Sequence, residues 1–405
     1  MRAELDNWRQ RDYIDLSVIT ITHGLSDGFA SLLVPVLALI VVDLGLSTFQ
    51  AGMVLSARSV AGLLFVYPLS MIADSTGRRK EMLLLGMALA TLLYLIMPLI
   101  HSFSWLLLVA FGVGVGNAVY HPCGTALVAR RFDRQRAMAL AFHGMGGNIG
   151  TSLMPLVQSV VVAIANWRTA IAICALPAVL LLPAVGLRFP PTDTAAAPRL
   201  GLQETVRSLT GAVVRNRGVV SLGIIYALEA MGSKGVIGFL PLIAAQRFGL
   251  DTPAIALAIS VYYTSGIVAK PLMGLLYNRW GARLALGVPL SLTGLFALAL
   301  GLTPWQGSLI PLAAAFGVVS PISPILLTAA AEFSDKETLA SSVGYIYTCN
   351  GMGFLSPLIG GWLGQHFGLS VGYIFFALII LAGAVATTSV PSATPAMRER
   401  AAAHG

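Results

Sequence analysis

The sequence predicts an all-α membrane protein, with twelve transmembrane helices arranged as two pseudo-symmetric six-helix bundles. Three observations lead to this prediction: the composition, the recurrence of apolar segments, and a repeat of the first half in the second. The 405-residue chain is 57% hydrophobic and 10% charged, whereas soluble proteins carry about 25% charged residues. The sequence lacks the ten-residue alternation that transmembrane β-strands would show.

Apolar segments recur along the chain, each near the roughly 20 residues that a helix needs to cross a bilayer. Their glycines and prolines are typical of helices that pack against each other in membranes. We expect no cleavable signal peptide, because the polar N-terminus precedes an apolar run too long for one. The predicted spans are 16–42, 50–72, 81–100, 105–128, 138–163, 169–187, 219–244, 253–276, 284–303, 308–331, 341–364 and 369–390.

The longest polar stretch, residues 188–218, divides the chain near its middle. We therefore expect an N-terminal bundle over 1–187, a cytoplasmic linker over 188–218, a C-terminal bundle over 219–390 and a cytoplasmic tail over 391–405.

The lysines and arginines predict the orientation. If the N-terminus is cytoplasmic, 20 of the 25 basic residues lie in cytoplasmic segments, two lie on the opposite side and three lie inside spans. This asymmetry follows the positive-inside rule and places both termini in the cytoplasm, in a bacterial-type inner membrane. The formal charge of +8 is then a topology signal, and a nucleic-acid partner is not expected.

The two halves match when the numbering is shifted by 204. Residues 44–52 then lie over 248–256, and residues 70–79 lie over 274–283. Since a repeat of six spans keeps its orientation, the halves form a parallel repeat, which is a transporter architecture. The matched pairs include Gly62 with Gly266, Asp74 with Asn278, Gly77 with Gly281 and Arg79 with Arg283.

The loop "SMIADSTGRRK" resembles the signature between the second and third helices of the major facilitator superfamily. Asp74, Gly77, Arg78 and Arg79 match that pattern, while serines replace its first glycine and its first basic residue. The second-half copy keeps Gly274, Arg279, Gly281 and Arg283 but has Asn278 in place of the acid. The resemblance implies a secondary transporter rather than an enzyme.

Physically, Gly77 allows a sharp turn, and Arg78 and Arg79 favour an anionic inner leaflet. The resemblance implies that Asp74 latches the two bundles, against the start of the eleventh span near Ser341. A solvated turn that only fixes topology is the alternative.

Five charged residues lie in the interior of predicted spans, away from the span ends, where each charge costs roughly 2.5–3.5 kcal/mol unless it faces water or a partner. The resemblance implies that the first, fourth, seventh and tenth helices line a central cavity, and Asn117, His121 and His23 lie on two of them. The charged residues are Asp27, Arg58, Glu229, Lys234 and Lys270.

Pairing would lower the cost of these charges. We expect Asp27 to pair with Arg58, and Glu229 to pair with Lys234 or Lys270, either as structural ion pairs or as part of the transport path. Because histidine titrates near neutral pH, we expect a proton to be exchanged by His23, Asp27, His121 or Glu229. His143 and His366 are interpreted as packing residues.

Residues 119–132 and 141–157 resemble the fosmidomycin-resistance branch of the superfamily, with its His-Pro and Gly-Gly-Asn motifs. The chain departs from the antiporter pattern at Met154-Pro155, and its fourth helix lacks an arginine that Arg58 would replace. The resemblance implies drug or metabolite efflux by proton antiport. The match lies at His121, Pro122, Gly146, Gly147, Asn148 and Gly150, and Pro155 completes the fifth-helix motif.

The sequence therefore predicts a proton-coupled exporter of small amphipathic organic molecules. The alternatives are an importer of an organic anion, which the small excess of basic residues in the spans would suit, and a non-transporting receptor of the same fold. No metal-ligand cluster, nucleotide loop or catalytic set stands out, so neither a metal nor another cofactor is expected. We expect a functional monomer embedded in the bilayer.

Overall fold

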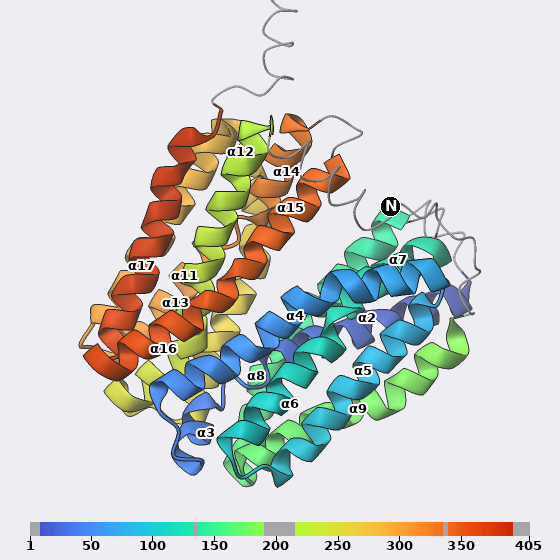
Figure 1. Cartoon of the computed structure of the whole chain (residues 1–405), viewed down its shortest axis with the longest axis horizontal. Coiled ribbons are helices and arrows are strands. Elements are labelled where there is room, and N and C mark those ends of the chain that lie inside the picture. Colours follow the sequence, from blue (N-terminus) through green and yellow to red (C-terminus); the bar gives the residue numbers. More distant parts are fainter. Residues whose placement is uncertain (1–8, 133–135, 190–214, 335–338, 392–405) are drawn as a thin grey trace, which may run out of the picture. The chain divides into compact units, whose positions relative to one another are not determined.

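The computed structural model describes residues 9–132, 136–189, 215–334 and 339–391, which are helical apart from turns and short connections (Figure 1). The chain forms two compact units, Met1–Arg199 with Leu250–Ser260 and Leu200–Gly249 with Val261–Gly405. The boundary between residues 199 and 200 falls inside the predicted linker.

The helices of the first half are α2 (Gln10–Ser31), α3 (Leu37–Asp43), α4 (Thr48–Thr76), α5 (Arg79–Ile96), η1 (Met97–Leu99), α6 (Phe103–Ala118), α7 (Tyr120–Arg131), α8 (Arg136–Ile164) and α9 (Trp167–Arg188). Those of the second half are α11 (Arg217–Phe248), α12 (Thr252–Leu302), η3 (Gln306–Ser308), α13 (Leu309–Val319), α14 (Ser323–Phe333), α15 (Leu339–Gly351), η4 (Met352–Phe354), α16 (Leu355–Phe367), α17 (Leu369–Ala386) and η5 (Thr387–Ser389).

Each of the twelve predicted spans coincides with helix, but the segmentation differs from the prediction. Within the described residues, nine stretches are long and apolar enough to cross a membrane. One of them, α12, holds the eighth and ninth predicted spans, joined by a kink at Gly281. The first and eleventh predicted spans are not among the nine.

Prolines account for breaks in the first, fourth and tenth spans. A proline cannot donate the hydrogen bond to the carbonyl four residues earlier. Pro122 follows the end of α6 at Ala118 by four residues, and Pro324 follows Ser320, where α13 has ended. In the first span, Pro35 lies between α2 and α3, where the Gln158 amide donates to the Leu32 carbonyl at 2.9 Å.

The backbone repeats the 204-residue shift. Gly45 and Gly249 have φ angles of 60° and 63°, and Gly77 and Gly281 have φ angles of 68° and 69°. Because these left-handed conformations favour glycine, the aligned glycines are explained by equivalent turns in both halves.

A basic side chain at the start of the third helix of each half binds the end of the sixth. Lys80 donates to the carbonyls of Gly186 at 3.3 Å and Phe189 at 3.0 Å. Arg283 donates to the carbonyls of Thr388 at 2.8 Å and Val390 at 2.9 Å. Cations are favourable at helix C-termini, where carbonyls lack partners.

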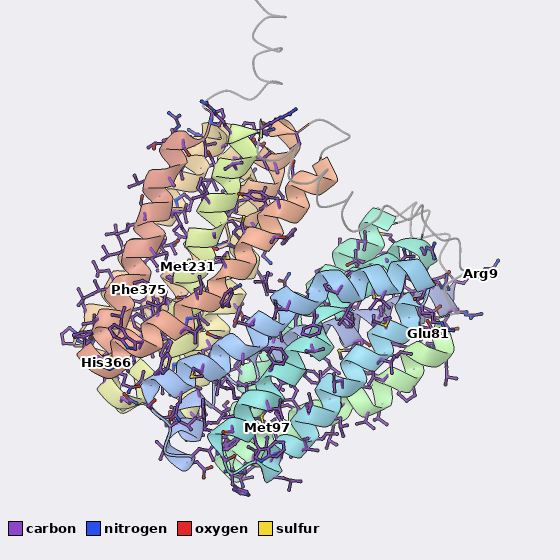
Figure 2. All side chains as sticks on the ribbon, viewed as in Figure 1. Arg9, Glu81, Met97, Met231, His366 and Phe375 are labelled. Carbon is purple, nitrogen blue, oxygen red and sulfur yellow. The ribbon has the colours of Figure 1, made fainter. Side chains whose placement is uncertain are left out.

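Large apolar side chains also cover much of the outside of the helices, which suits a surface bathed in lipid (Figure 2). Leu180 on α9, for example, is 79% exposed, whereas Phe29, Tyr94 and Tyr120 are fully buried inside the first unit. An exposed apolar surface of this kind is unfavourable in water.

Candidate functional site

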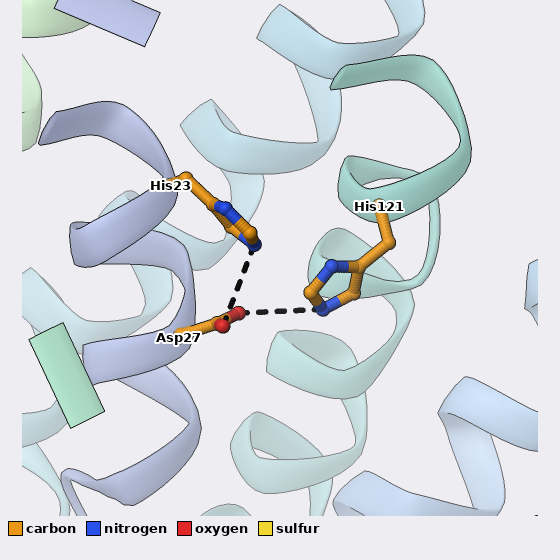
Figure 3. A group of neighbouring side chains, drawn as sticks. All are labelled: His23, Asp27 and His121. Atoms are coloured by element: carbon orange, nitrogen blue, oxygen red, sulfur yellow. Dashed lines mark ion pairs between the residues drawn. The ribbon is translucent and has the colours of Figure 1, made fainter. Parts of the chain in front are cut away.

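The structure brings together three polar side chains that the sequence singled out in the first half. His23 and Asp27 lie one turn apart on α2, and His121 lies at the start of α7, just after the break in the fourth span. Asp27 Oδ2 is 3.4 Å from His23 Nε2, and Asp27 Oδ1 is 3.3 Å from His121 Nε2 (Figure 3). The carboxylate therefore lies between two imidazoles.

The two histidines differ in accessibility. The His23 side chain is 10% exposed, while that of His121 is 62% exposed and that of Asp27 is 25% exposed. The group thus runs from an accessible imidazole, through a partly accessible carboxylate, to a buried imidazole.

His143, interpreted from the sequence as a packing residue, also belongs to this cluster. Its ring stacks on the ring of His23, with centroids 4.2 Å apart and planes inclined by 19°. The Tyr120 ring also stacks on His23, at 5.4 Å. A signal was present in the sequence, because His143 precedes Gly147 by four residues and therefore shares its helix face.

The backbone of His143 fixes the tautomer of His23. His23 Nδ1 lies 2.7 Å from the His143 carbonyl oxygen. Because a carbonyl oxygen only accepts, Nδ1 carries the hydrogen. His23 Nε2 is buried without a hydrogen bond of ordinary geometry among the described residues, and it faces Asp27.

Glycines of the fifth-helix motif allow α8 to approach α2 closely. A Cβ atom at Gly146 would collide with the Thr20 carbonyl, and one at Gly150 would collide with the Gly24 backbone. A Cβ at Gly147 would meet the Asp27 carboxylate and the His23 ring. The Gly-Gly motif therefore makes room for the polar cluster as well as for the helix contact.

The remaining motif residues differ in their burial. Asn148 is half-buried, and Pro155 is buried within α8, which continues through it without a break. Both amide atoms of Asn117, on α6, are buried without a hydrogen-bond partner in the described part of the chain.

The expected pair between Asp27 and Arg58 is not formed. The ion pairs that Asp27 makes within the described residues are those with His23 and His121. Arg58 lies on α4, which packs chiefly against α6, whereas α2 packs chiefly against α8. A Cβ at Gly114 of α6 would collide with the Arg58 backbone, so this helix contact holds Arg58 against α6.

In the second half, Glu229 and Lys234 lie on α11 and Lys270 lies on α12. Glu229 is buried, at 7% exposure. Lys234 Nζ donates to the Asn350 carbonyl at 3.0 Å, and to the Asn350 side chain at 3.4 Å. Lys234 thus joins α11 to α15, while Lys270 is half-buried.

The signature loops contain sharp turns at Gly77 and Gly281, as their φ angles require. Arg78 and Asn278 are exposed, and Arg79 is half-buried. The side chains of Asp74 and Ser341 lie outside the described residues, so the latch remains a prediction.

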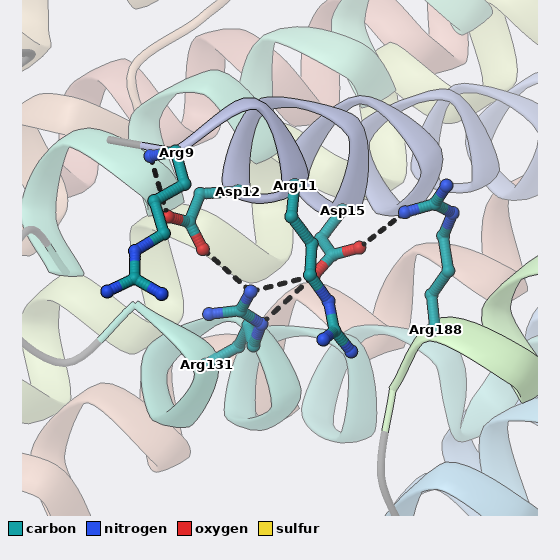
Figure 4. A network of polar contacts seen from close by, with 6 residues as sticks. All are labelled: Arg9, Arg11, Asp12, Asp15, Arg131 and Arg188. Atoms are coloured by element: carbon teal, nitrogen blue, oxygen red, sulfur yellow. Dashed lines mark hydrogen bonds and ion pairs between the residues drawn. The ribbon is translucent and has the colours of Figure 1, made fainter.

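An ion network that the sequence analysis did not identify joins the start of α2 to the ends of α7 and α9 (Figure 4). Asp15 is fully buried and accepts from Arg131 at 2.8 and 3.1 Å and from Arg188 at 2.9 Å. Arg131 also donates to Asp12 at 2.7 Å. Sequence spacing could not reveal the contacts between helices in this network, since Arg131 and Arg188 lie more than 110 residues from Asp15.

Burial raises the pKa of Asp12, but the backbone N–H of Arg9 and the Arg131 guanidinium together lower it by more than burial raises it. The pKa of Asp12 is therefore below its ordinary value. These contacts favour the ionised carboxylate. The network therefore depends on the charge of Asp12 as well as on that of Asp15.

The ligand atoms of His23, Asp27 and His121 lie within 4.8 Å of one another. Two imidazoles and a carboxylate are donors that divalent transition metals accept, so this arrangement could hold a metal as well as a proton. The sequence predicted no metal-ligand cluster here, because His121 is distant in sequence from His23 and Asp27.

Comparisons with known proteins agree with this architecture. The Major Facilitator Superfamily profile matches residues 19–228 and 222–404. The chain is 23% identical to the fosmidomycin resistance protein of Escherichia coli K12, over 91% of this chain and 90% of that protein. It is 30% identical to a probable L-galactonate transporter of the same organism, over 31% of this chain and 28% of that protein.

Solved structures share the fold. A bacterial homolog of the human lysosomal transporter Spinster, in an inward-facing and occupied conformation, has a TM-score of 0.81 at 17% identity and covers 95% of this chain and 97% of its own. The nucleoside transporter NupG has a TM-score of 0.80 at 15% identity and covers 93% and 99%.

Multiple apolar helices and a repeated backbone define a multi-pass membrane transporter, not an enzyme. The chain belongs to the Major Facilitator Superfamily.

Proposed function

We propose that this protein is a proton-coupled exporter of small amphipathic organic molecules. It works by alternating access in a bacterial-type inner membrane, as a monomer with both termini in the cytoplasm. The likeness to a fosmidomycin resistance protein over 91% of the chain supports efflux. The basic residues counted on one side of the predicted spans support the orientation.

One observation carries the proton coupling: His23 Nδ1 is bound to the His143 carbonyl at 2.7 Å while Nε2 faces Asp27 at 3.4 Å. With its hydrogen on Nδ1, a neutral His23 would direct the lone pair of Nε2 at the carboxylate. Two acceptors facing each other in a buried place are unfavourable. A proton on Nε2 or on Asp27 removes the conflict, so we assign this conformation to the proton-loaded state of the proposed cycle.

The neighbouring rings favour transfer along this line. Tyr120 and His143 both stack on His23 and restrict its rotation, so its Nε2 stays directed towards Asp27. His121 is the accessible member and contacts the other carboxylate oxygen. A proton therefore enters at His121, passes to Asp27 and reaches His23.

The charge of the cluster changes with the proton. Without it, Asp27 and two neutral histidines carry one negative charge, and with it the cluster is neutral. Since a charge inside a membrane helix costs roughly 2.5–3.5 kcal/mol, protonation favours states in which the cluster is closed off from water. Deprotonation then requires the cluster to meet water again.

A second candidate is transport of an organic anion. The supporting observation is the 30% identity to a probable L-galactonate transporter over 127 residues. Basic residues on the spans, Arg58, Lys234 and Lys270, would suit a carboxylate. A non-transporting receptor is the remaining alternative.

The test is flux in proteoliposomes with an imposed pH gradient, using a panel that includes fosmidomycin and sugar acids. Proton-driven export requires an amphipathic substrate to move against the proton flow, and this movement to collapse when an ionophore dissipates the gradient. Movement of a sugar acid in the same direction as the protons would instead support the importer. If no panel member is transported, the result would support the non-transporting receptor.

Two controls sharpen this test. His366 lies on α16, where its Nδ1 is 2.9 Å from the Trp362 carbonyl (Figure 2), so His366→Gln should transport like the wild type, whereas His23→Gln should lose gradient dependence. Flux is also measured after treatment with a chelator. Loss of transport in the chelator would show that His23, Asp27 and His121 hold a metal and would contradict the proton site.

A further inference from the structure

An apolar groove lies between α2, α8 and α9 of the first unit, beside the glycine contact that supports the polar cluster. Its volume is about 440 Å³, within the range of pockets that hold small organic ligands. The groove is lined by Thr20, Ile21, Gly24, Leu25, Gly146, Ile149, Gly150, Leu153, Met154, Val157, Ile173, Cys174 and Pro177.

Glycines at the contact of α2 and α8 form part of the groove wall, and its opening is apolar. These glycines are Gly24, Gly146 and Gly150. At the opening, Ile21 is 54% exposed and Leu153 is 52% exposed. The exposed side of a transporter helix at this depth faces hydrocarbon, so an acyl chain is the occupant that the bilayer supplies.

A positively charged cluster lies at one end of the same helices. The six residues of the ion network are four arginines and two aspartates (Figure 4), so the network has a net charge of +2. The Arg11 side chain is 73% exposed, and that of Arg188 is 34% exposed. Since each guanidinium has five N–H donors, their contacts with Asp15 leave further donors for an anion.

The distance along α9 between Arg188 and the groove residue Pro177 matches one leaflet of a membrane. Arg188 follows Pro177 by eleven residues on α9, which is three helical turns, so both lie on the same face. At 1.5 Å per residue, they are about 16 Å apart along the helix. One leaflet is half of a hydrocarbon core about 30 Å thick, or about 15 Å.

We propose that this site binds an anionic phospholipid, with its phosphate at Arg11 and Arg188 and one acyl chain in the groove. The arginines supply the selectivity, because an acyl chain is as apolar in the bilayer as in the groove and gains only packing. The lipid then lies against Gly146 and Gly150, on the contact between α2 and α8 that also positions Asp27.

The test is mass spectrometry of the intact protein released from mild detergent, after delipidation and addition of phosphatidylglycerol or phosphatidylcholine vesicles. We expect one phosphatidylglycerol retained per chain. Leu153→Trp, which fills the groove from its opening, should abolish retention, and so should Ile149→Trp. The control Val160→Trp lies on α8 with 63% exposure, outside the groove, and should retain the lipid.

The head group is tested separately. Arg11→Gln should reduce the preference for phosphatidylglycerol about fivefold, since one basic residue contributes about that factor at an anionic surface. The control Arg130→Gln, exposed on α7, should keep the preference. Equal retention in Leu153→Trp and Val160→Trp would overturn the acyl-chain site, and equal binding of the two lipids by the wild type would overturn the selectivity for an anionic head group.

Discussion

The two halves of the chain share a scaffold but differ in their buried chemistry. Each has a left-handed glycine at equivalent turns and a basic residue, Lys80 or Arg283, that binds carbonyls at the end of the sixth helix. On the first helix, Asp27 lies between two histidines. Its approximate counterpart on α11, Glu229, has no ion pair of this kind with a histidine in the described residues.

At the other end of the helices, the two halves again share a contact but differ in the side chain that makes it. Arg168, at the start of α9, pairs with Asp43 and donates to the carbonyls of Pro98 at 3.1 Å and Ile100 at 2.9 Å. In the second half an arginine again binds the loop between the third and fourth spans, but it comes from the end of α11: Arg247 donates to the Leu302 carbonyl at 2.9 Å. A carbonyl at a helix end can accept a hydrogen bond from an arginine on either neighbouring helix. The arginine contact with this loop is therefore present in both halves, although the arginine comes from a different helix in each.

These contrasts teach that the repeat preserves backbone turns and helix ends, whereas side chains inside the spans are free to specialise. In the function that we propose, the first half carries the proton chemistry. Predictions that separate the halves test this interpretation.

The largest expected effect is on coupling. Asp27→Asn removes the carboxylate between two histidines, and gradient-driven transport should fall by about 100-fold, the lower limit for losing a proton-transfer group. Exchange of substrate without a gradient should persist, because the helices still assemble. Glu229→Gln should keep its dependence on the gradient. Flux in proteoliposomes measures both, and equal loss in the two variants would remove the distinction between the halves.

Asp15 should matter most for stability. Asp15→Asn removes the buried charge that faces Arg131 and Arg188 and replaces one of its two acceptor oxygens with an NH2 donor. It should lower the free energy of unfolding by about 1.5–3 kcal/mol, as for hydrogen bonds to charged groups. The position 204 residues later is Val219, so the second half has no equivalent charge. Thermal unfolding in detergent measures this loss, and an unchanged midpoint would show that the network contributes nothing.

The contact between α2 and α8 offers a matched pair of glycines on one helix. Gly150→Ala places a methyl group against the Gly24 backbone and should destabilise the protein by about 1–3 kcal/mol, as overpacking does. Gly144 has nothing within 4 Å of a Cβ atom, so Gly144→Ala should be neutral or slightly stabilising. Both are compared by thermal unfolding, and similar midpoints would contradict the close approach of the helices.

The matched helix-end cations should have smaller and similar effects. Lys80→Ala and Arg283→Ala each remove a cation from the carbonyls of a helix end, a contribution of about 0.3–1 kcal/mol. Thermal unfolding of the single variants tests whether the two halves are equivalent here. A large difference between them would show that only one half depends on this contact.

The smallest effect is an acid dependence confined to the first half. The pKa of Asp12 is below its ordinary value of 3.8, so the folded state favours its ionised form. Its stabilisation is fully present above that value and is lost as the pH falls through the lowered pKa. The difference in unfolding midpoint between wild type and Asp12→Asn should therefore shrink below about pH 4, and a constant difference would refute this role.

The sequence predicted the glycine positions of both turns and the residues His23, Asp27 and His121. It failed on the pairing of Asp27, because adjacency of spans in the chain did not reveal that α4 packs on α6. It also interpreted His143 as a packing residue. The ring of His143 stacks on His23 and its backbone carbonyl accepts a hydrogen bond from His23. No sequence motif marks a histidine with these two contacts.

By itself, the sequence determined the class of this protein, its repeat and the helices that carry charge, because hydrophobicity and glycine act locally along the chain. The tertiary structure decided which groups meet: Asp27 with two histidines, and Asp15 with three arginines. The physical reason is that electrostatic and hydrogen-bond partners are chosen by helix packing, which joins residues more than a hundred positions apart.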